Sequence, residues 1–211
     1  MSFYLFSITG ASAAILGVLA AGFAYRGKEG EPYSLLNHFI SELGEAGVSR
    51  LSWVFNFGLI LSGISLVGAS ISLGLILPGI LAKIGMILGI ICSIALTFVG
   101  LFPMDKIKPH GHAALTYFRS GLLMMIFFNL AIAFQPEGLQ VLPRIYSLAG
   151  VPAIISFTSF LFLIQGSTRK KDADPLSTEE VERPKIWPIA IVEWSIFITI
   201  VTWFVVIGVG L

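Results

Sequence analysis

Long apolar segments alternate with short polar stretches along the whole chain. Six of these segments are long enough, at about 20 residues each, to cross a bilayer as helices. We expect spans at about residues 3–25, 52–77, 80–102, 112–134, 141–165 and 187–210. Pro78 and Gly79 mark a tight turn between the second and third spans. The pattern therefore predicts an all-α, polytopic membrane protein with six transmembrane helices in a single membrane domain, residues 1–211.

The polar stretch after the first span, residues 32–47, is sharply two-sided. Apolar and polar positions recur there with the spacing of a helix that has one face of each kind. The apolar face would hold Leu35, Leu36, Phe39, Ile40 and Leu43, and the polar face Asn37, His38, Ser41, Glu42 and Glu45. Ser34 can cap the start, and Gly44 or Gly47 can end it. We therefore expect a short amphipathic interfacial helix in the first loop, with a polar face that needs partners.

Composition agrees with a membrane protein and excludes several other classes. The chain is 56% hydrophobic and only 12% charged, with a mean hydropathy of +0.91, whereas a soluble domain has about 25% charged residues. A net charge of +1 without a clustered basic face argues against nucleic-acid binding. The single Cys92 excludes an internal disulfide and a multi-cysteine zinc site. The expected partners are membrane lipids, and the sequence leaves the oligomeric state open.

The distribution of positive charge predicts an orientation. Residues 166–186 are rich in charge and poor in apolar side chains, which is typical of a solvated linker. The odd-numbered loops together hold eleven of the Lys and Arg residues, and the even-numbered loops hold two. The positive-inside rule then places the odd loops and the linker in the cytoplasm, with both termini outside.

Several polar residues lie inside the predicted spans near that same face. Asn56 is about one turn into the second span, and Arg119 and Glu193 lie at similar depths in the fourth and sixth, about 9–10 Å from the predicted helix starts. Charged groups in spans usually face the bundle interior and pair, so we expect Arg119 to pair with Glu193 and the two helices to be neighbours. In the alternative, Arg119 extends along its helix toward lipid phosphates.

Two histidine-bearing segments add candidate chemistry. His38, Ser41 and Glu42 have the i, i+3, i+4 spacing that would let an imidazole approach a hydroxyl or a carboxylate, as in a nucleophilic site. The alternative for these three is the solvated polar face of an interfacial helix.

The second segment is the polar stretch 103–111, which leads into the fourth span. If its end is extended, His110 and His112 point the same way and could bind zinc or iron together with Asp105, Glu42 or His38. If the helix already includes His110, only His112 shares the face of Arg119. A divalent metal therefore stays open as a cofactor, and simple loop polarity is the alternative.

The two stretches NHFISELGEAG and GLFPMDKIKPHGHAALTYFRSG resemble the motif regions of the domain-of-unknown-function family 998, a family of six-span membrane proteins. The resemblance extends from the first span to the sixth. The positions that it implies are His38, Ser41, Glu42, Gly44, Pro103, Asp105 and one of His110 and His112. It implies no established activity.

Together these residues predict one cytoplasm-facing polar pocket that acts on a lipid or lipid-like headgroup, as a hydrolase or transferase. The candidate catalytic residues are His38, Ser41, Glu42, Asp105 and His112, and the candidate substrate-binding residues are Asn56, Lys106, His110, Arg119 and Glu193. One alternative is a small proton-coupled transporter or permease, which would need polar residues to continue toward the outer side. The other alternative is a non-catalytic lipid-sensing protein.

Overall fold

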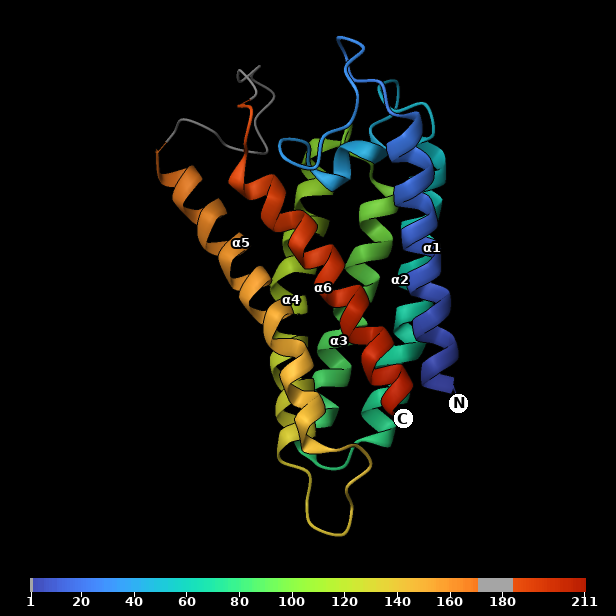
Figure 1. The fold of residues 1–211 in the computed structure, drawn as a ribbon, viewed down its shortest axis with the longest axis vertical. Coiled ribbons are helices and arrows are strands. Elements are labelled where there is room, and N and C mark those ends of the chain that lie inside the picture. Colours follow the sequence, from blue (N-terminus) through green and yellow to red (C-terminus); the bar gives the residue numbers. More distant parts are fainter. Residues whose placement is uncertain (1, 171–183) are drawn as a thin grey trace.

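The structure, a computed structural model, describes residues 2–170 and 184–211 and shows a bundle of long helices (Figure 1). The helices are α1 (Ser2–Ala24), α2 (Ser52–Ile76), α3 (Ile80–Leu101), α4 (Ile107–Ala133), α5 (Val151–Lys170) and α6 (Pro188–Gly210), with short 3-10 helices η1 (Ile40–Gly44) and η2 (Arg144–Gly150). Among the described residues, six helices are long and apolar enough to cross a membrane, the fifth being counted as Arg144–Gly166. The prediction of an all-α protein with six candidate spans is confirmed. Most of the predicted linker, residues 166–186, lies outside the described residues.

Consecutive helices pack side by side, and the last returns to the first. Each of α1, α2 and α3 packs against the next helix, α5 packs against α6, and α6 also contacts α1. Both chain ends lie at one end of the bundle, and the α1–α2 and α3–α4 connections lie at the other (Figure 1). We call this second end the loop-1 end. Which end faces the cytoplasm stays a prediction.

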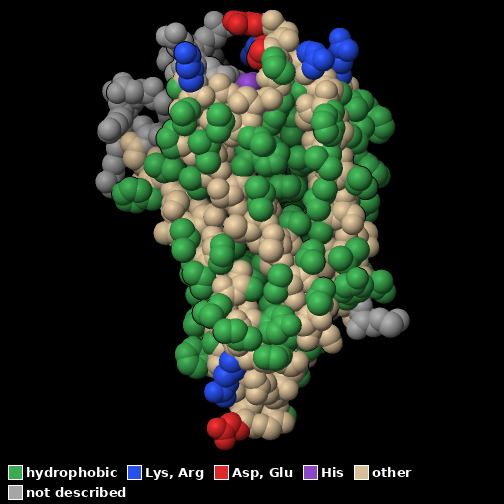
Figure 2. Space-filling view, in the orientation of Figure 1, with side chains coloured by type: hydrophobic (Ala, Val, Ile, Leu, Met, Phe, Trp, Pro, Cys, Tyr) green, Lys and Arg blue, Asp and Glu red, His purple; other side chains and the backbone are tan. Residues whose placement is uncertain are grey.

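The outer surface has the distribution of side chains that a bilayer requires. On the face shown in Figure 2, charged side chains gather at the two ends of the molecule, and hydrophobic side chains cover the broad band between them. Many large hydrophobic side chains of the helices are exposed, among them Phe23 at 83% and Phe162 at 74%. Exposed apolar surface on this scale is stable only against lipid or another protein.

Two connections differ in how well the sequence predicted them. The α2–α3 turn is as expected, because Gly79 takes a φ of +87°, a value that favours glycine. The fourth helix begins at Ile107, five residues before the predicted start at residue 112, so both His110 and His112 are helical. The alternative of an extended segment that presents both histidines on one side is therefore wrong.

The first loop folds inward instead of forming one amphipathic helix over residues 32–47. Its helical part is the five-residue η1. Within this loop Leu35 and Leu36 are about half exposed, while His38 and Glu42 are only 2% and 4% exposed. The two-sided pattern was misleading because the polar side chains find partners inside the protein. The carboxylate of Glu42, for example, accepts a hydrogen bond from the backbone N–H of Phe39 at 2.8 Å and caps η1.

The helices α4 and α6 meet through large side chains in the half of the bundle that holds the chain ends. The rings of Phe128 and Trp203 have centroids 6.1 Å apart, and Trp203 Nε1–H donates to Asn129 Oδ1 at 3.2 Å. All three side chains are buried. The interhelical space is thus filled near the chain ends, and a cavity occupies it toward the loop-1 end.

Candidate functional site

A cavity of about 440 Å³ lies between the first loop, the N-terminal half of α4, α5 and the first turns of α6. Its apolar walls consist of Phe39, Met104, Ile107, Ala114, Leu115, Phe118, Phe160, Leu161, Ile164 and Ile189. The remaining lining residues are Gly111 and five polar ones, Ser41, His110, Arg119, Gln165 and Glu193. The sequence predicted a polar pocket, whereas the walls of this cavity are mostly apolar with a few polar side chains among them.

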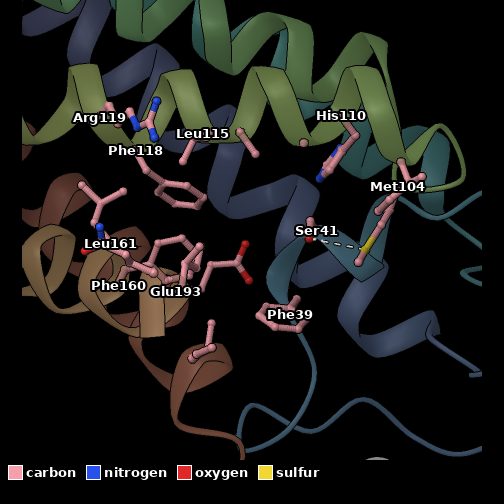
Figure 3. A pocket seen from close by; sticks show the side chains of 16 residues that line it. Phe39, Ser41, Met104, His110, Leu115, Phe118, Arg119, Phe160, Leu161 and Glu193 are labelled. Carbon is pink, nitrogen blue, oxygen red and sulfur yellow. Dashed lines mark hydrogen bonds between the residues drawn. The ribbon is translucent and has the colours of Figure 1, made fainter. Parts of the chain in front are cut away.

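Glu193 is the acidic residue that projects into this space. It lies on α6, one turn and a half from the start of the helix, and is only 7% exposed. Its Oε2 accepts a hydrogen bond of 2.8 Å from the backbone N–H of Ile40. Its other oxygen, Oε1, has no hydrogen-bond partner among the residues that the structure describes. Figure 3 shows the carboxylate extending from α6 into the space below α4.

His110 enters the same space from the first turn of α4 and is 5% exposed. Its Nδ1 lies 2.8 Å from the carbonyl oxygen of Phe102. Because a carbonyl can only accept, Nδ1–H is the donor, and the neutral ring therefore keeps Nε2 as an acceptor. The ring points from α4 toward the cavity (Figure 3). A histidine held in one tautomer by a carbonyl is oriented for proton transfer at its other nitrogen.

Ser41 is a third polar residue of the cavity and lies on η1. Its hydroxyl donates to the sulfur of Met104 at 3.6 Å, the one interaction drawn in Figure 3. A thioether is a weak acceptor, so this contact orients the hydroxyl without activating it as a nucleophile. The structure thus brings together Ser41, His110 and Glu193 from η1, α4 and α6.

The predicted pair between Arg119 and Glu193 is wrong. Both residues line the cavity, yet no ion pair joins them among the described residues. Since α4 begins at Ile107, Arg119 lies about 18 Å along its helix, whereas Glu193 lies about 7.5 Å along α6. The two therefore differ in depth. In Figure 3 the Arg119 side chain lies against α4, away from the Glu193 carboxylate.

His112 lies on a different face of α4 from His110, since two residues are about 200° apart on a helix. It is exposed, its Nδ1–H donates to the carbonyl of Lys108 at 2.8 Å, and it lines a separate groove between α3 and α4. Asp105 and Lys106 are exposed in the α3–α4 connection. Among the described residues no group of three or more His, Cys, Asp or Glu side chains could hold a metal. The two-histidine metal site is thus not assembled.

The remaining candidates, His38 and Glu42 of the first loop and Asn56 of α2, make contacts that hold the fold together. His38 packs against Tyr25 and Tyr33, with ring centroids 5.3 and 5.1 Å away, and does not line the cavity. Asn56 donates from Nδ2 to the carbonyl of Gly44 at 2.9 Å, which fixes the end of η1 on α2. With Glu42 capping η1, the proposed arrangement of His38, Ser41 and Glu42 does not share one site.

Sequence reasoning missed the aromatic residues that hold the first loop on α6. The indole N–H of Trp194 donates to the hydroxyl of Tyr33 at 3.0 Å, and that hydroxyl donates to the carbonyl of Phe39 at 2.9 Å. Burial raises the pKa of Tyr33 far above its usual range, and the nearby carboxylates of Glu193 and Glu42 raise it further. Tyr33 is therefore a neutral donor. The sequence did contain a signal for this contact, because Tyr33 lies in a polar loop and Trp194 lies beside the acidic Glu193 in a predicted span.

Comparison with known protein families assigns the chain to one family. Residues 8–210 match the family model described as "Protein of unknown function (DUF998)", which covers nearly the whole chain. The protein is therefore a polytopic membrane protein of this class. It belongs to the DUF998 family, as its two motif regions indicated. A search of curated proteins finds no match. A search of solved structures finds none either.

Proposed function

We propose that this protein binds a lipid-like amphiphile in the cavity between α4, α5 and α6. The apolar chain of the ligand lies along Phe118, Phe160 and Leu161, and its polar group meets Glu193 and His110. The observation that carries the proposal is the buried Glu193 carboxylate, which projects into a mostly apolar cavity within the membrane-spanning bundle. Ionisable groups at membrane depth are costly and in general serve a function.

The size and position of the cavity support this proposal. Small-molecule sites commonly enclose about 300–1,000 Å³, with apolar walls and a few convergent polar groups. Figure 1 shows α5 diverging from the rest of the bundle toward the loop-1 end, where α4 and α5 both line the cavity. A membrane ligand could therefore enter sideways between these helices without crossing water.

Acid–base chemistry on the bound headgroup, of hydrolase or transferase type, is the second candidate. The oriented tautomer of His110, with Nε2 toward the cavity that also holds Glu193, favours it. Transport has less support. The polar residues nearer the chain ends bond to the protein itself, as Asn129 does with Trp203 and Gln135 does with the backbone of Leu142.

Binding can be tested with tetradecanol that carries a diazirine on its chain. The purified protein in detergent is labelled by light, and the modified peptides are mapped by mass spectrometry. We expect labels on α4 and α5 at the cavity walls. The change Leu161→Trp should abolish them by filling the cavity, whereas Phe162→Trp, on the exposed side of the same helix, should not. Equal labelling in both variants would show that the probe samples only the outer surface.

A further inference from the structure

We propose that the amphiphile carries an amine headgroup, bound as an ammonium by Glu193, His110 and Ser41. This ligand class rests on the proposed function, since it assumes an occupant of the same cavity. It excludes the more common anionic membrane headgroups from the site. The amine proposal follows from two independent properties of these three residues. One is the direction of their hydrogen bonds, and the other is the charge of the site.

Each of the three groups can accept a hydrogen bond from the ligand. When its carboxyl group is ionised, Oε1 of Glu193 accepts, and Nε2 of neutral His110 accepts because its Nδ1–H is engaged by Phe102. The hydroxyl of Ser41 directs its proton to Met104 and keeps its lone pairs. The part of the ligand that meets these three groups must therefore donate. An ammonium group offers three donors, which equals the number of acceptors that η1, α4 and α6 supply.

The charge of the site decides between an amine headgroup and a hydroxyl headgroup, both of which can donate hydrogen bonds. The side chain of Glu193 is more than nine-tenths buried and forms no ion pair with any described residue. A second buried carboxylate, Glu42, lies nearby, because it accepts from the backbone N–H of Phe39 and Glu193 accepts from the next N–H along the chain, that of Ile40. A buried carboxylate without a cation is costly and takes up a proton instead, so Glu193 is held in its ionised form only by a cationic partner. An ammonium compensates that charge, a hydroxyl does not, and a carboxylate or phosphate headgroup would add to the repulsion.

Arg119, the cationic residue that lines the cavity, does not neutralise Glu193 in place of an ammonium ligand. Arg119 lies nine residues beyond His110 on α4, about 13.5 Å along the helix axis. Its side chain lies against α4 in Figure 3 and not beside the Glu193 carboxylate. The end of the cavity near η1 is therefore the negative end, and we place the ammonium there.

The test uses three diazirine probes with the same chain and different heads, tetradecylamine, tetradecanol and myristate. Labelling of the cavity peptides of α4 and α5 is divided by labelling of the lipid-exposed face of α2 around Trp53 and Phe57 in the same sample. This ratio removes differences in partitioning into the micelle. We expect the amine to exceed the alcohol by about tenfold, as a buried charge pair would give, and the carboxylate to fall below the alcohol.

The variant Glu193→Gln keeps an acceptor for the N–H of Ile40 and removes the charge. It should reduce the ratio of amine to alcohol labelling to about one, whereas Phe162→Trp, which lies outside the cavity, should leave that ratio as it is in the unmodified protein. If all three heads label the cavity equally in the unmodified protein, the amine proposal is overturned and amphiphile binding stands. A preference for the alcohol or the carboxylate overturns it as well. If no probe labels the cavity above the α2 face, the proposed function itself fails.

Discussion

The carboxylate of Glu193 accepts a hydrogen bond of 2.8 Å from the backbone N–H of Ile40, which joins the sixth span to the first loop. Two further contacts act at the same junction. The N–H of Trp187 donates to the carbonyl of Leu36 at 2.8 Å, and the ring of Trp187 packs on Phe39 with centroids 4.8 Å apart. The loop-1 end of the cavity is thus closed by a segment fixed to α6, and the charged residue of the site is also part of the attachment.

Glu193 should therefore affect stability as well as binding. Glu193→Ala removes the acceptor for a partly buried N–H and should lower the free energy of unfolding by about 1–3 kcal/mol. Glu193→Gln keeps an acceptor and should cost less than about 1 kcal/mol. Thermal unfolding of both variants in the same detergent measures the difference. Equal melting of Glu193→Ala and the unmodified protein would mean that the bond to Ile40 contributes nothing.

Gly44 should tolerate no side chain. A Cβ at this position would overlap Oδ1 of Asn56 and approach the ring of Phe55, so Gly44→Ala must displace η1 from α2. We expect a loss of about 1–3 kcal/mol in unfolding free energy. Gly166→Ala is the matched control, because no atom lies within 4 Å of the added carbon and alanine favours a helix. A similar melting temperature for the two variants would contradict the close approach.

Trp203 should be the most sensitive tryptophan to substitution. It is fully buried between α4 and α6 and donates its N–H to Asn129. Trp203→Phe leaves a void and an unpaired amide oxygen, and should cost about 2–4 kcal/mol. Trp53→Phe, at a position 68% exposed on α2, should change stability by less than about 0.5 kcal/mol. Unfolding of both variants in parallel tests whether large side chains set the distance between α4 and α6.

The two histidines of α4 should behave differently in binding. His110→Ala removes an acceptor from the cavity and should weaken binding of the amine probe by about tenfold, the equivalent of one good hydrogen bond. His112→Ala alters an exposed residue on another face and should leave binding unchanged. Titration of cavity labelling against probe concentration gives both affinities. An equal loss in both variants would show that the effect is not local to the cavity.

The orientation can be tested with single cysteines in opposite loops. Glu29→Cys lies in the exposed first loop and Glu137→Cys in the exposed α4–α5 loop, while the native Cys92 is buried. The positive-inside rule predicts that an impermeant maleimide labels intact cells only at residue 137. Residue 29 should react after permeabilisation. The reverse result would place the cavity at the outer side of the membrane.

Hydropathy alone predicted the six spans, because a helix in lipid must be about 20 apolar residues long and satisfy its own backbone. The site was predicted only in part, with Ser41, His110, Arg119 and Glu193 among the candidates that line the cavity. The start of α4 was the main source of error. Placing it at residue 112 gave Arg119 and Glu193 equal depth, and starting it at Ile107 removes that coincidence.

The first loop shows why a periodic pattern does not identify the surroundings of a side chain. Residues 32–47 alternate as an amphipathic helix would, yet His38 and Glu42 are buried and Leu35 is exposed. Glu42 is held by the backbone N–H of Phe39, and the ring of His38 packs against Tyr25 and Tyr33. The spacing of apolar and polar residues does not encode these contacts. The apolar walls were likewise unpredictable, since Phe118 and Phe160 look like any other residues of a span.

An experimental density map of the protein, purified into nanodiscs from the membrane in which it is expressed, tests the central claim most directly. We expect elongated density in the cavity, with the ligand chain against Phe118 and Phe160 and the polar end within hydrogen-bond distance of Glu193 Oε1. Leu161→Trp should remove this density without moving the helices. A map in which α5 closes on α4 and side chains fill the cavity would contradict the account.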